Sequence, residues 1–294
     1  MENSLIIKIG AAGDVVRTTS LLNVITGNIY WITGNASKPL FPEDIQRLKV
    51  LSLEEAAYSL KNIRFSRVIS LEEDDHCAQL AISVKANHLT GIYADDGKIN
   101  YTDDSSCWFD MSRVSKLGIK KANELKKQNE LPYQHYIFQM IGKKFGGEPY
   151  WIFANRMVNS NAGLIGIEKR IGKQWPNKQW NGYDELIKRL GENGYRIRIL
   201  EQRDDIRDYL VDIAECDHIV SGDTLAMHIA LGYKKTCTAI FNCTSPQEIY
   251  DYGLMKKVVS PLLDKYFYSG SYDTEVIESL SVDEVIGAIP LAVK

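Results

Sequence analysis

The sequence has few cysteines, and their spacing gives no pair. There are five in 294 residues, an odd number, and none are separated by two residues as in a CxxC motif. A disulfide framework or a zinc knuckle is therefore not expected. Buried, reduced thiols are the favoured interpretation.

Long apolar runs are also absent. No run approaches the roughly 18 to 20 residues needed to span a bilayer. The first residues, MENSLIIK, begin acidic and enter a strand pattern at once, which differs from a signal peptide. We expect a cytoplasmic protein, with peripheral contact to the inner membrane surface left open.

The chain carries no large excess of charge of either sign. Lysine and arginine number 35, aspartate and glutamate 38, and the formal net charge is -3. This balance gives no electrostatic case for nucleic acid as the main partner. The acidic run from Glu72 to His76 could bind a metal, but adjacent acids rarely converge on one ion, so a solvated helix start is the favoured interpretation.

Alternating strand and helix patterns fill the chain. The length predicts two domains, because one core usually serves about 100 to 200 residues. Strands are expected at 4–9, 28–33 and 65–71, and again at 162–167, 195–200, 218–221 and 235–241. Helices are expected at 14–25, 53–60, 72–84, 112–128, 133–144, 183–192, 204–215 and 224–232. This alternation predicts an α/β protein with parallel sheets in both halves.

A glycine-rich break marks the expected domain boundary. Gly146 to Pro149 (GGEP) interrupts a helical pattern just before a new alternation begins. We therefore expect domains at 1–147 and 148–280. A capping-box pattern at Ser281 to Glu284 predicts a last helix within 281–294, and packing on the N-terminal domain is one option for it.

The first strand leads into a loop of small residues, Gly10 to Gly13 (GAAG), and then to Asp14. This loop lacks the GxGxxG spacing, which argues against a nicotinamide-binding unit. Asp14 has two interpretations on the sequence alone. Its carboxylate could cap the first helix, or it could act as an acid or base.

A second strand-to-helix turn lies at Val220 to His228 (VSGDTLAMH). In parallel sheets, ligands bind at such carboxyl-end turns, and the N–H groups of the new helix attract phosphate. The turn therefore predicts a nucleotide or sugar-phosphate site.

Four blocks of the sequence resemble one known family. They are Ile7 to Leu22 (IKIGAAGDVVRTTSLL), Gly172 to Trp180 (GKQWPNKQW), Ser221 to His228 (SGDTLAMH) and Phe241 to Pro246 (FNCTSP). In this order they resemble the signature segments of the heptosyltransferases, glycosyltransferase family 9.

The resemblance implies a GT-B architecture, with two Rossmann-like domains facing across a cleft. The N-terminal domain would bind the acceptor and the C-terminal domain the nucleotide-sugar. The implied reaction is an inverting transfer of a sugar, a heptose from ADP-heptose being the expected one, to a glycan, lipid-linked or other hydroxyl acceptor, as in lipopolysaccharide biosynthesis. It requires no metal and no cofactor, since the nucleotide-sugar is a substrate.

The resemblance also implies roles for residues at matching positions. Asp14 would be the general base, with Gly13, Arg17 and Thr18 beside it in the acceptor loop. The implied donor-binding residues are Asp223, Thr224 and His228, a lysine that is either Lys173 or Lys178, and Glu201 toward the nucleoside. Lys173 is narrowly favoured, because Lys173 to Pro176 keeps the proline of the family motif.

The chain departs from the family at three places. Leu225 stands where a glycine is usual, Asn242 and Cys243 replace Gly-Pro, and the segment after Leu200 is short. These departures leave two alternatives open: a non-catalytic protein that binds sugar-nucleotides or glycans, and a nucleotide-sugar epimerase or hydrolase of the same architecture.

Overall fold

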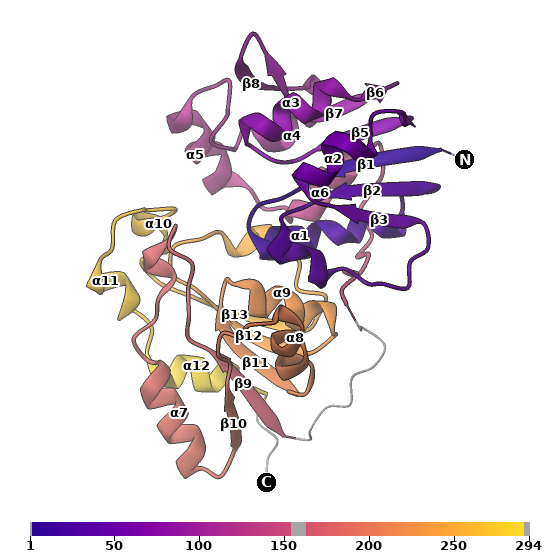
Figure 1. Cartoon of the computed structure of the whole chain (residues 1–294). Helices are drawn as coiled ribbons and strands as arrows, with labels where there is room; N and C mark the ends of the chain where they lie inside the picture. Colours follow the sequence, from indigo (N-terminus) through magenta and orange to yellow (C-terminus); the bar gives the residue numbers. More distant parts are fainter. Residues whose placement is uncertain (1, 154–162, 291–294) are drawn as a thin grey trace. The chain divides into compact units, whose positions relative to one another are not determined.

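The computed structural model describes residues 2–153 and 163–290. The chain divides into two compact units, Met1–Phe153 and Ala154–Lys294 (Figure 1). The division falls a few residues after the GGEP break that predicted it. Ala162, expected to begin a strand, and the end of the expected C-terminal segment, 291–294, lie outside the described residues.

The first unit is built on a six-stranded sheet in the order β3-β2-β1-β5-β7-β8. All neighbouring pairs are parallel except β7 and β8, which form an antiparallel hairpin. Its strands are β1 (Asn3–Ile7), β2 (Asn28–Ile32), β3 (Leu48–Leu51), β5 (Arg67–Ser70), β7 (Leu89–Asp95) and β8 (Lys98–Tyr101), and a separate pair joins β4 (Arg64–Phe65) to β6 (Lys85–Ala86).

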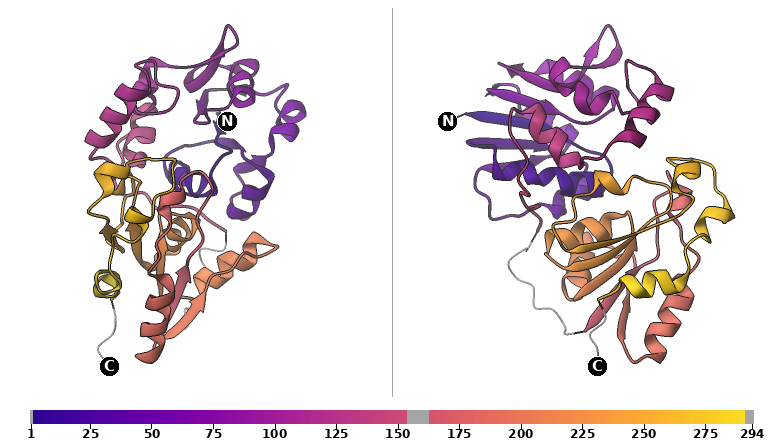
Figure 2. Two further views of the ribbon diagram at one scale, coloured as in Figure 1. Left: turned by 90° about the vertical axis from the view of Figure 1, so that its left-hand side faces the viewer. Right: turned by 180° about the vertical axis from the view of Figure 1, so that it is seen from behind.

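Helices cover both faces of this sheet (Figure 2). The α-helices are α1 (Ala12–Thr18), α2 (Leu53–Ser59), α3 (Asp75–Ser83), α4 (Ser106–Phe109), α5 (Ile119–Gln128) and α6 (Tyr133–Met140), and the 3-10 helices are η1 (Thr19–Asn23), η2 (Asn35–Leu40) and η3 (Asp103–Ser105). Successive residues of a strand point to opposite faces. Ile6 accordingly packs in one apolar cluster with α1 and α6, whereas Leu5 and Ile7 pack in another with α2 and α3.

The second unit has a five-stranded, all-parallel sheet in the order β10-β9-β11-β12-β13. Its strands are β9 (Leu164–Glu168), β10 (Arg196–Ile199), β11 (His218–Gly222), β12 (Thr236–Phe241) and β13 (Met255–Val259). Its helices are η4 (Pro176–Lys178), α7 (Tyr183–Glu192), α8 (Ile206–Ala214), α9 (Leu225–Gly232), η5 (Pro246–Glu248), α10 (Leu263–Tyr266), α11 (Thr274–Ile277) and α12 (Val282–Ala288). The described part of the chain contains no helix with the length and apolar character to cross a membrane.

Helix α12 belongs to the second unit. It begins with the predicted capping box, in which Ser281 and Glu284 satisfy each other's backbone N–H groups. Its buried Val285 lies in the core of this unit, and the helix packs against α7, β12 and β13. These contacts lie within the second unit, and packing of the helix on the N-terminal domain stays a prediction.

In both sheets the chain reverses its winding direction beside the first strand. This topological switch lies between β1 and β5 in the first unit and between β9 and β11 in the second. In open parallel sheets, ligands bind outside the carboxyl ends of the strands at such a point. The segments that follow β1 and β11 hold the residues predicted to be functional, Asp14 in the first turn of α1 and Asp223 in the turn before α9.

Candidate functional site

Asp14 lies between two cations in the first turn of α1. Its Oδ1 is 2.8 Å from Arg17 Nη2, and its Oδ2 is 4.0 Å from Lys8 Nζ. The N-cap of α1 is Ala11, whose φ is 33°, so Asp14 is not the capping residue. About a third of the Asp14 side chain is exposed, which leaves the carboxylate accessible while both cations are largely buried.

Glu72 holds Lys8 and the backbone of the loop. Its Oε2 accepts hydrogen bonds from Lys8 Nζ at 3.2 Å, from the N–H of Ile9 at 2.9 Å and from the N–H of Gly10 at 2.6 Å. Burial disfavours the ammonium of Lys8, but attraction to Asp14 and Glu72 outweighs this, and the pKa of Lys8 is raised. The interpretation of Glu72 as part of a solvated helix start is therefore wrong.

The acidic run as a whole has a mixed role. Asp74 is the N-cap of α3 and accepts the N–H groups of His76 and Cys77, so a helix does start here. Glu72 instead turns back to the β1 loop because it follows β5, the neighbour of β1 in the sheet. Within residues 2–153 and 163–290, no group of three or more histidine, cysteine, aspartate or glutamate side chains is arranged to hold a metal ion.

Tyr133 of α6 contacts both Arg17 and Thr18. The Arg17 guanidinium lies 4.1 Å from the Tyr133 ring centroid, a cation–π distance. Thr18 Oγ1 donates to the carbonyl oxygen of Asp14 at 2.6 Å and lies 3.2 Å from the Tyr133 hydroxyl. Burial raises the pKa of Tyr133, although Lys8 and Arg17 oppose the shift. The predicted acceptor-loop residues Arg17 and Thr18 thus lie beside Asp14, and Gly13 precedes it in the same turn.

In the second unit, Lys178 is bound to Asp223. Its Nζ donates to both the backbone carbonyl and Oδ2 of Asp223, each at 2.8 Å. Both side chains are mostly buried, with 17% and 15% of their surface exposed. Burial opposes ionisation of Asp223, but attraction to Lys178 and His228 and the hydrogen bond from Lys178 hold its pKa well below its usual range.

Helix α9 begins immediately after Asp223. Thr224 is its N-cap residue, yet the Thr224 side chain makes no cap hydrogen bond, and its Oγ1 is buried without a hydrogen-bond partner among the described residues. His228 lies in the next turn and is 4% exposed. The N–H groups of the first turn of a helix have no partners within the helix, so this end can receive an anion. Leu225 is half-buried at the first helical position, so its replacement of a glycine does not prevent the turn.

Asn242, one of the residues that depart from the family pattern, makes a specific hydrogen bond. It follows β12, and its Nδ2 donates to the carbonyl oxygen of Gln179 at 2.6 Å. Its Oδ1 is buried and has no hydrogen-bond partner within the described residues. Gln179 directly follows Lys178, so Asn242 fixes the loop that carries this lysine.

The remaining predicted donor residues lie outside this cluster. Lys173 is exposed, and no ion pair joins it to an acid among the described residues. Glu201 is exposed beyond the end of β10, the edge strand, and β9 separates β10 from β11. The structure therefore brings together Lys178, Asp223, Thr224 and His228, and it places Lys178 rather than the favoured Lys173 at Asp223.

A buried group beside this cluster was missed in the sequence. Glu168 ends β9 and pairs with Ser221 of β11 in the sheet register. Its carboxylate accepts hydrogen bonds from Arg170 Nε at 2.9 Å and from the Tyr209 hydroxyl at 2.6 Å. Its position at a strand end next to the switch point was the available signal.

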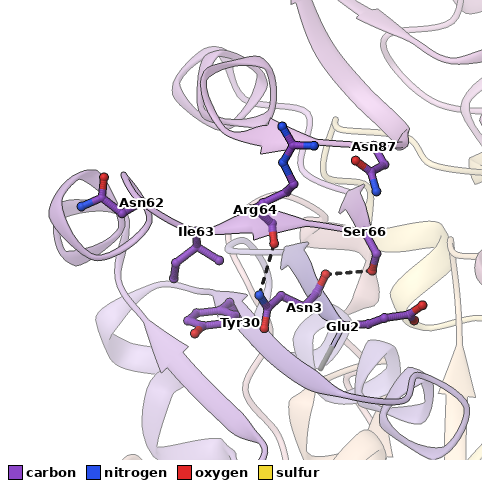
Figure 3. A pocket seen from close by; sticks show the side chains of 8 residues that line it. All are labelled: Glu2, Asn3, Tyr30, Asn62, Ile63, Arg64, Ser66 and Asn87. Carbon is purple, nitrogen blue, oxygen red and sulfur yellow. Dashed lines mark hydrogen bonds between the residues drawn. The ribbon is translucent and has the colours of Figure 1, made fainter.

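A shallow pocket of about 520 Å³ lies elsewhere in the first unit. Its lining residues are Glu2, Asn3, Tyr30, Asn62, Ile63, Arg64, Ser66 and Asn87 (Figure 3). Two hydrogen bonds in the pocket wall join Asn3 to Arg64 and Ser66. Asn3 begins β1, whereas Asp14 follows the carboxyl end of this strand. The pocket therefore lies at the amino-terminal end of β1 and contains none of the predicted site residues.

Several solved glycosyltransferase structures are similar to this chain. The Escherichia coli ADP-heptose lipopolysaccharide heptosyltransferase II matches with a TM-score of 0.62 at 15% identity, covering 98% of each chain. A glycosyltransferase family 9 protein from Veillonella parvula has a TM-score of 0.58 at 15% identity, covering 98% of this chain and 95% of the other. The E. coli heptosyltransferase WaaC with ADP has a TM-score of 0.53 at 12% identity, covering 97% and 96%.

No protein-family model matches the sequence, and no curated protein matches it. The structural matches span nearly the whole chain at low identity, so they establish the fold. The chain has the two-unit α/β fold of the GT-B heptosyltransferases, as the sequence predicted.

Proposed function

We propose that this protein is a glycosyltransferase that moves a sugar from a nucleotide-sugar to a hydroxyl acceptor. The observation that carries the proposal is the pairing of two sites, each at the switch point of its own sheet. One presents an accessible carboxylate between cations at Asp14. The other presents a cation close to a helix start, Lys178 bound to Asp223, the residue before the N-cap Thr224 of α9.

The second unit supplies the donor site in this proposal. The diphosphate of the donor binds at the start of α9, where backbone N–H groups and the Thr224 hydroxyl face it. Lys178 neutralises the charge that develops on the leaving nucleoside diphosphate. Asp223 keeps Lys178 in place through two hydrogen bonds and is itself a positioning residue.

We propose ADP-heptose as the donor, because similar folds include a heptosyltransferase with ADP and an ADP-heptose heptosyltransferase. A panel of ADP-, UDP-, GDP- and dTDP-sugars tests it directly.

The first unit supplies the general base, Asp14. Its carboxylate lies between the ammonium of Lys8 and the guanidinium of Arg17, and about a third of the side chain is exposed and can reach an acceptor. The acceptor hydroxyl loses its proton to Asp14 as its oxygen attacks the anomeric carbon. The bond to the diphosphate breaks in the same displacement, and the anomeric configuration inverts.

The test is transfer of labelled sugar from each donor to an acceptor panel that includes lipopolysaccharide-core glycans. The Asp14→Asn variant keeps the shape of the side chain but cannot take the proton. We expect the turnover number of the variant to be at least about 100-fold below that of wild type, with equal donor binding by both proteins in calorimetry. A smaller loss of turnover would remove Asp14 from the mechanism.

The second candidate is a non-catalytic sugar-nucleotide binder, which Leu225 and the short segment after Leu200 favour. Donor binding without transfer to any acceptor, and without release of free sugar, would support it. Release of free sugar without an acceptor would instead indicate a nucleotide-sugar hydrolase.

A further inference from the structure

The most basic surface of the first unit is residues 113–131, called the basic segment below. It carries six basic side chains and two acidic ones, although the whole chain has a net charge of -3. The basic side chains are Arg113, Lys116, Lys120, Lys121, Lys126 and Lys127, and the acidic ones are Glu124 and Glu130. The segment contains α5 and lies on the outer side of the first unit, opposite the N-terminus (Figures 1 and 2).

Three large aliphatic side chains of the same segment are exposed to solvent. Leu117 is 52% exposed, Ile119 58% and Leu131 42%. Leu117 precedes α5, Ile119 is its first residue and Leu131 follows it, and the helix buries only Ala122. Single exposed aliphatic residues are common, but three among six cations in 19 consecutive residues form a mixed basic and apolar surface.

The segment holds a fixed shape at both ends. Lys116 Nζ donates to the carbonyl oxygen of Tyr101 at 2.8 Å. At the other end, the side chain of Asn129 bonds the N–H and carbonyl of Leu131, both at 2.9 Å, and accepts the Tyr136 hydroxyl at 2.6 Å. The exposure of Leu117 and Leu131 therefore belongs to an ordered surface.

Nearby acids neutralise only part of the positive charge. Lys121 pairs with Glu124 at 3.3 Å, and Arg113 lies 3.7 Å from Glu73. Lys120 pairs with no acid among the described residues. The basic segment thus presents an excess of positive charge to solvent.

We propose that the basic segment docks this protein on an anionic membrane surface. Lysines near such a surface attract anionic headgroups, and exposed aliphatic side chains enter the boundary between headgroups and acyl chains. Nucleic acid fits less well, because the segment contains no aromatic side chain on which a base could stack.

Ring contacts connect this surface to the Asp14 site. Lys126 lies 5.4 Å from the Trp108 ring, Trp108 lies 4.8 Å from Tyr133, and Arg17 lies 4.1 Å from Tyr133. If the proposed transfer holds, on which this step rests, docking brings Asp14 close to the headgroup layer, where a lipid-linked acceptor displays its hydroxyl groups. The docking itself does not depend on the transfer.

The test is sedimentation of the full chain with vesicles of phosphatidylcholine, with and without 30% phosphatidylglycerol, a fraction on the order of that in anionic leaflets. We expect binding only to the anionic vesicles and a steep loss on the order of 0.5 M salt, because salt screens the attraction. Lys120→Glu with Lys127→Glu should weaken binding about 20-fold or more, since each charge contributes roughly fivefold. Leu117→Ser with Ile119→Ser should weaken it about fivefold or more.

The matched control reverses two exposed lysines on other elements of the same unit, Lys61→Glu with Lys85→Glu. It changes the net charge equally, and its affinity should stay within about threefold of wild type. Equal loss in the control, or no binding of wild type to anionic vesicles, would overturn the proposal. Binding of a single-stranded oligonucleotide through Lys120 and Lys127, without vesicle binding, would assign the surface to nucleic acid instead.

Calorimetry with the nucleotide-sugar panel on the same four proteins separates the two proposals. None of the substituted residues belongs to the donor site, so donor binding should be unchanged in every variant. Absence of donor binding in wild type would contradict the proposed transferase and leave the vesicle result intact.

Discussion

The ion pair between Lys178 and Asp223 gives the sharpest prediction for the proposed donor site. The substitution Lys178→Met keeps most of the side-chain volume and removes the charge. It leaves the Asp223 carboxylate mostly buried and without the two hydrogen bonds from Lys178 Nζ. Breaking a fully buried pair costs about 3–5 kcal/mol, and the exposed sixth of each side chain reduces this to about 2–3 kcal/mol.

This loss is measured by differential scanning calorimetry of the full chain. The melting temperature of the second unit should fall by about 5–10 °C, at about 2–4 °C per kcal/mol. Adding Asp223→Asn to Lys178→Met should recover about 1–2 kcal/mol, because no uncompensated charge is then buried. The pair's contribution is present above pH about 4 and is lost as the pH falls further, because the pKa of Asp223 is lowered in the folded state.

The same variant tests phosphate binding. Loss of one charged hydrogen bond to a diphosphate should weaken nucleotide affinity about 10- to 100-fold. The matched control is Lys173→Met, which lies on the same loop but is exposed. Its melting temperature should change by about 1 °C or less and its affinity by about threefold or less. A larger affinity loss for Lys173→Met than for Lys178→Met would refute the assignment, and an unchanged melting temperature for Lys178→Met would refute the energetic reasoning.

Three further outcomes are expected. Asp14→Asn should lower the turnover number about 10²- to 10⁴-fold without changing donor affinity by calorimetry, and a smaller loss would argue against a general base. Burial lowers the pKa of His218 to about 4, so stability should fall by about 2–3 kcal/mol as the pH drops from about 6.5 to 4, and His218→Gln should abolish this dependence in urea unfolding. Gly182→Ala places a Cβ 2.1 Å from Cζ2 of the buried Trp180 and should lower the free energy of unfolding by about 1–3 kcal/mol or more, measured by thermal unfolding. The control Gly191→Ala, whose Cβ would meet no described atom within 4 Å beyond its chain neighbours and helix backbone, should instead stabilise α7 by about 0.5–1 kcal/mol.

The central strands and the capped helices could be predicted from sequence. β1, β2 and β11 are apolar runs buried on both faces, and such runs are visible without any knowledge of the neighbours. The capping box at Ser281 was also a local signal that the structure confirms. Both kinds of feature depend on residues close together in the chain.

The edge strands β3, β8 and β13 were missed because their patterns are weaker, whereas the edge strand β10 was predicted. In β13, Lys256 and Lys257 interrupt the apolar run, which an edge strand tolerates because part of it faces solvent. Lys257 is stabilised by donating to two backbone carbonyls, of Pro246 and Ile249, and these contacts cannot be read from spacing. The hairpin of β7 and β8 is not among the expected strands, because Asp95 and Asp96 dominate its tip.

For the candidate sites too, residues in local motifs could be predicted, whereas residues placed by distant contacts could not. Asp14, Asp223 and His228 were located by local motifs, whereas Glu72 and Glu168 were not. The partners of Glu72, Lys8 and Gly10, are more than 60 positions away, and they meet it only because β1 and β5 pair in register. The choice between Lys173 and Lys178 depended on which lysine the loop directs toward Asp223. The conformation of this loop is held by a hydrogen bond from Asn242, which follows β12, to the carbonyl oxygen of Gln179.

Ala11 has a wider consequence for the first unit. An alanine with a φ of 33° occupies a conformation that glycine adopts more easily, at a cost of about 1 kcal/mol. A glycine here would relieve that strain but would also allow the loop many shapes before a ligand arrives. Alanine restricts the loop, and the hydrogen bonds from Ile9 and Gly10 to Glu72 select one shape. Under the proposed function, an acceptor would bind a preorganised loop, and the loop would lose less conformational entropy on binding. The strain at Ala11 would thus lower the stability of the loop but raise its affinity for the acceptor.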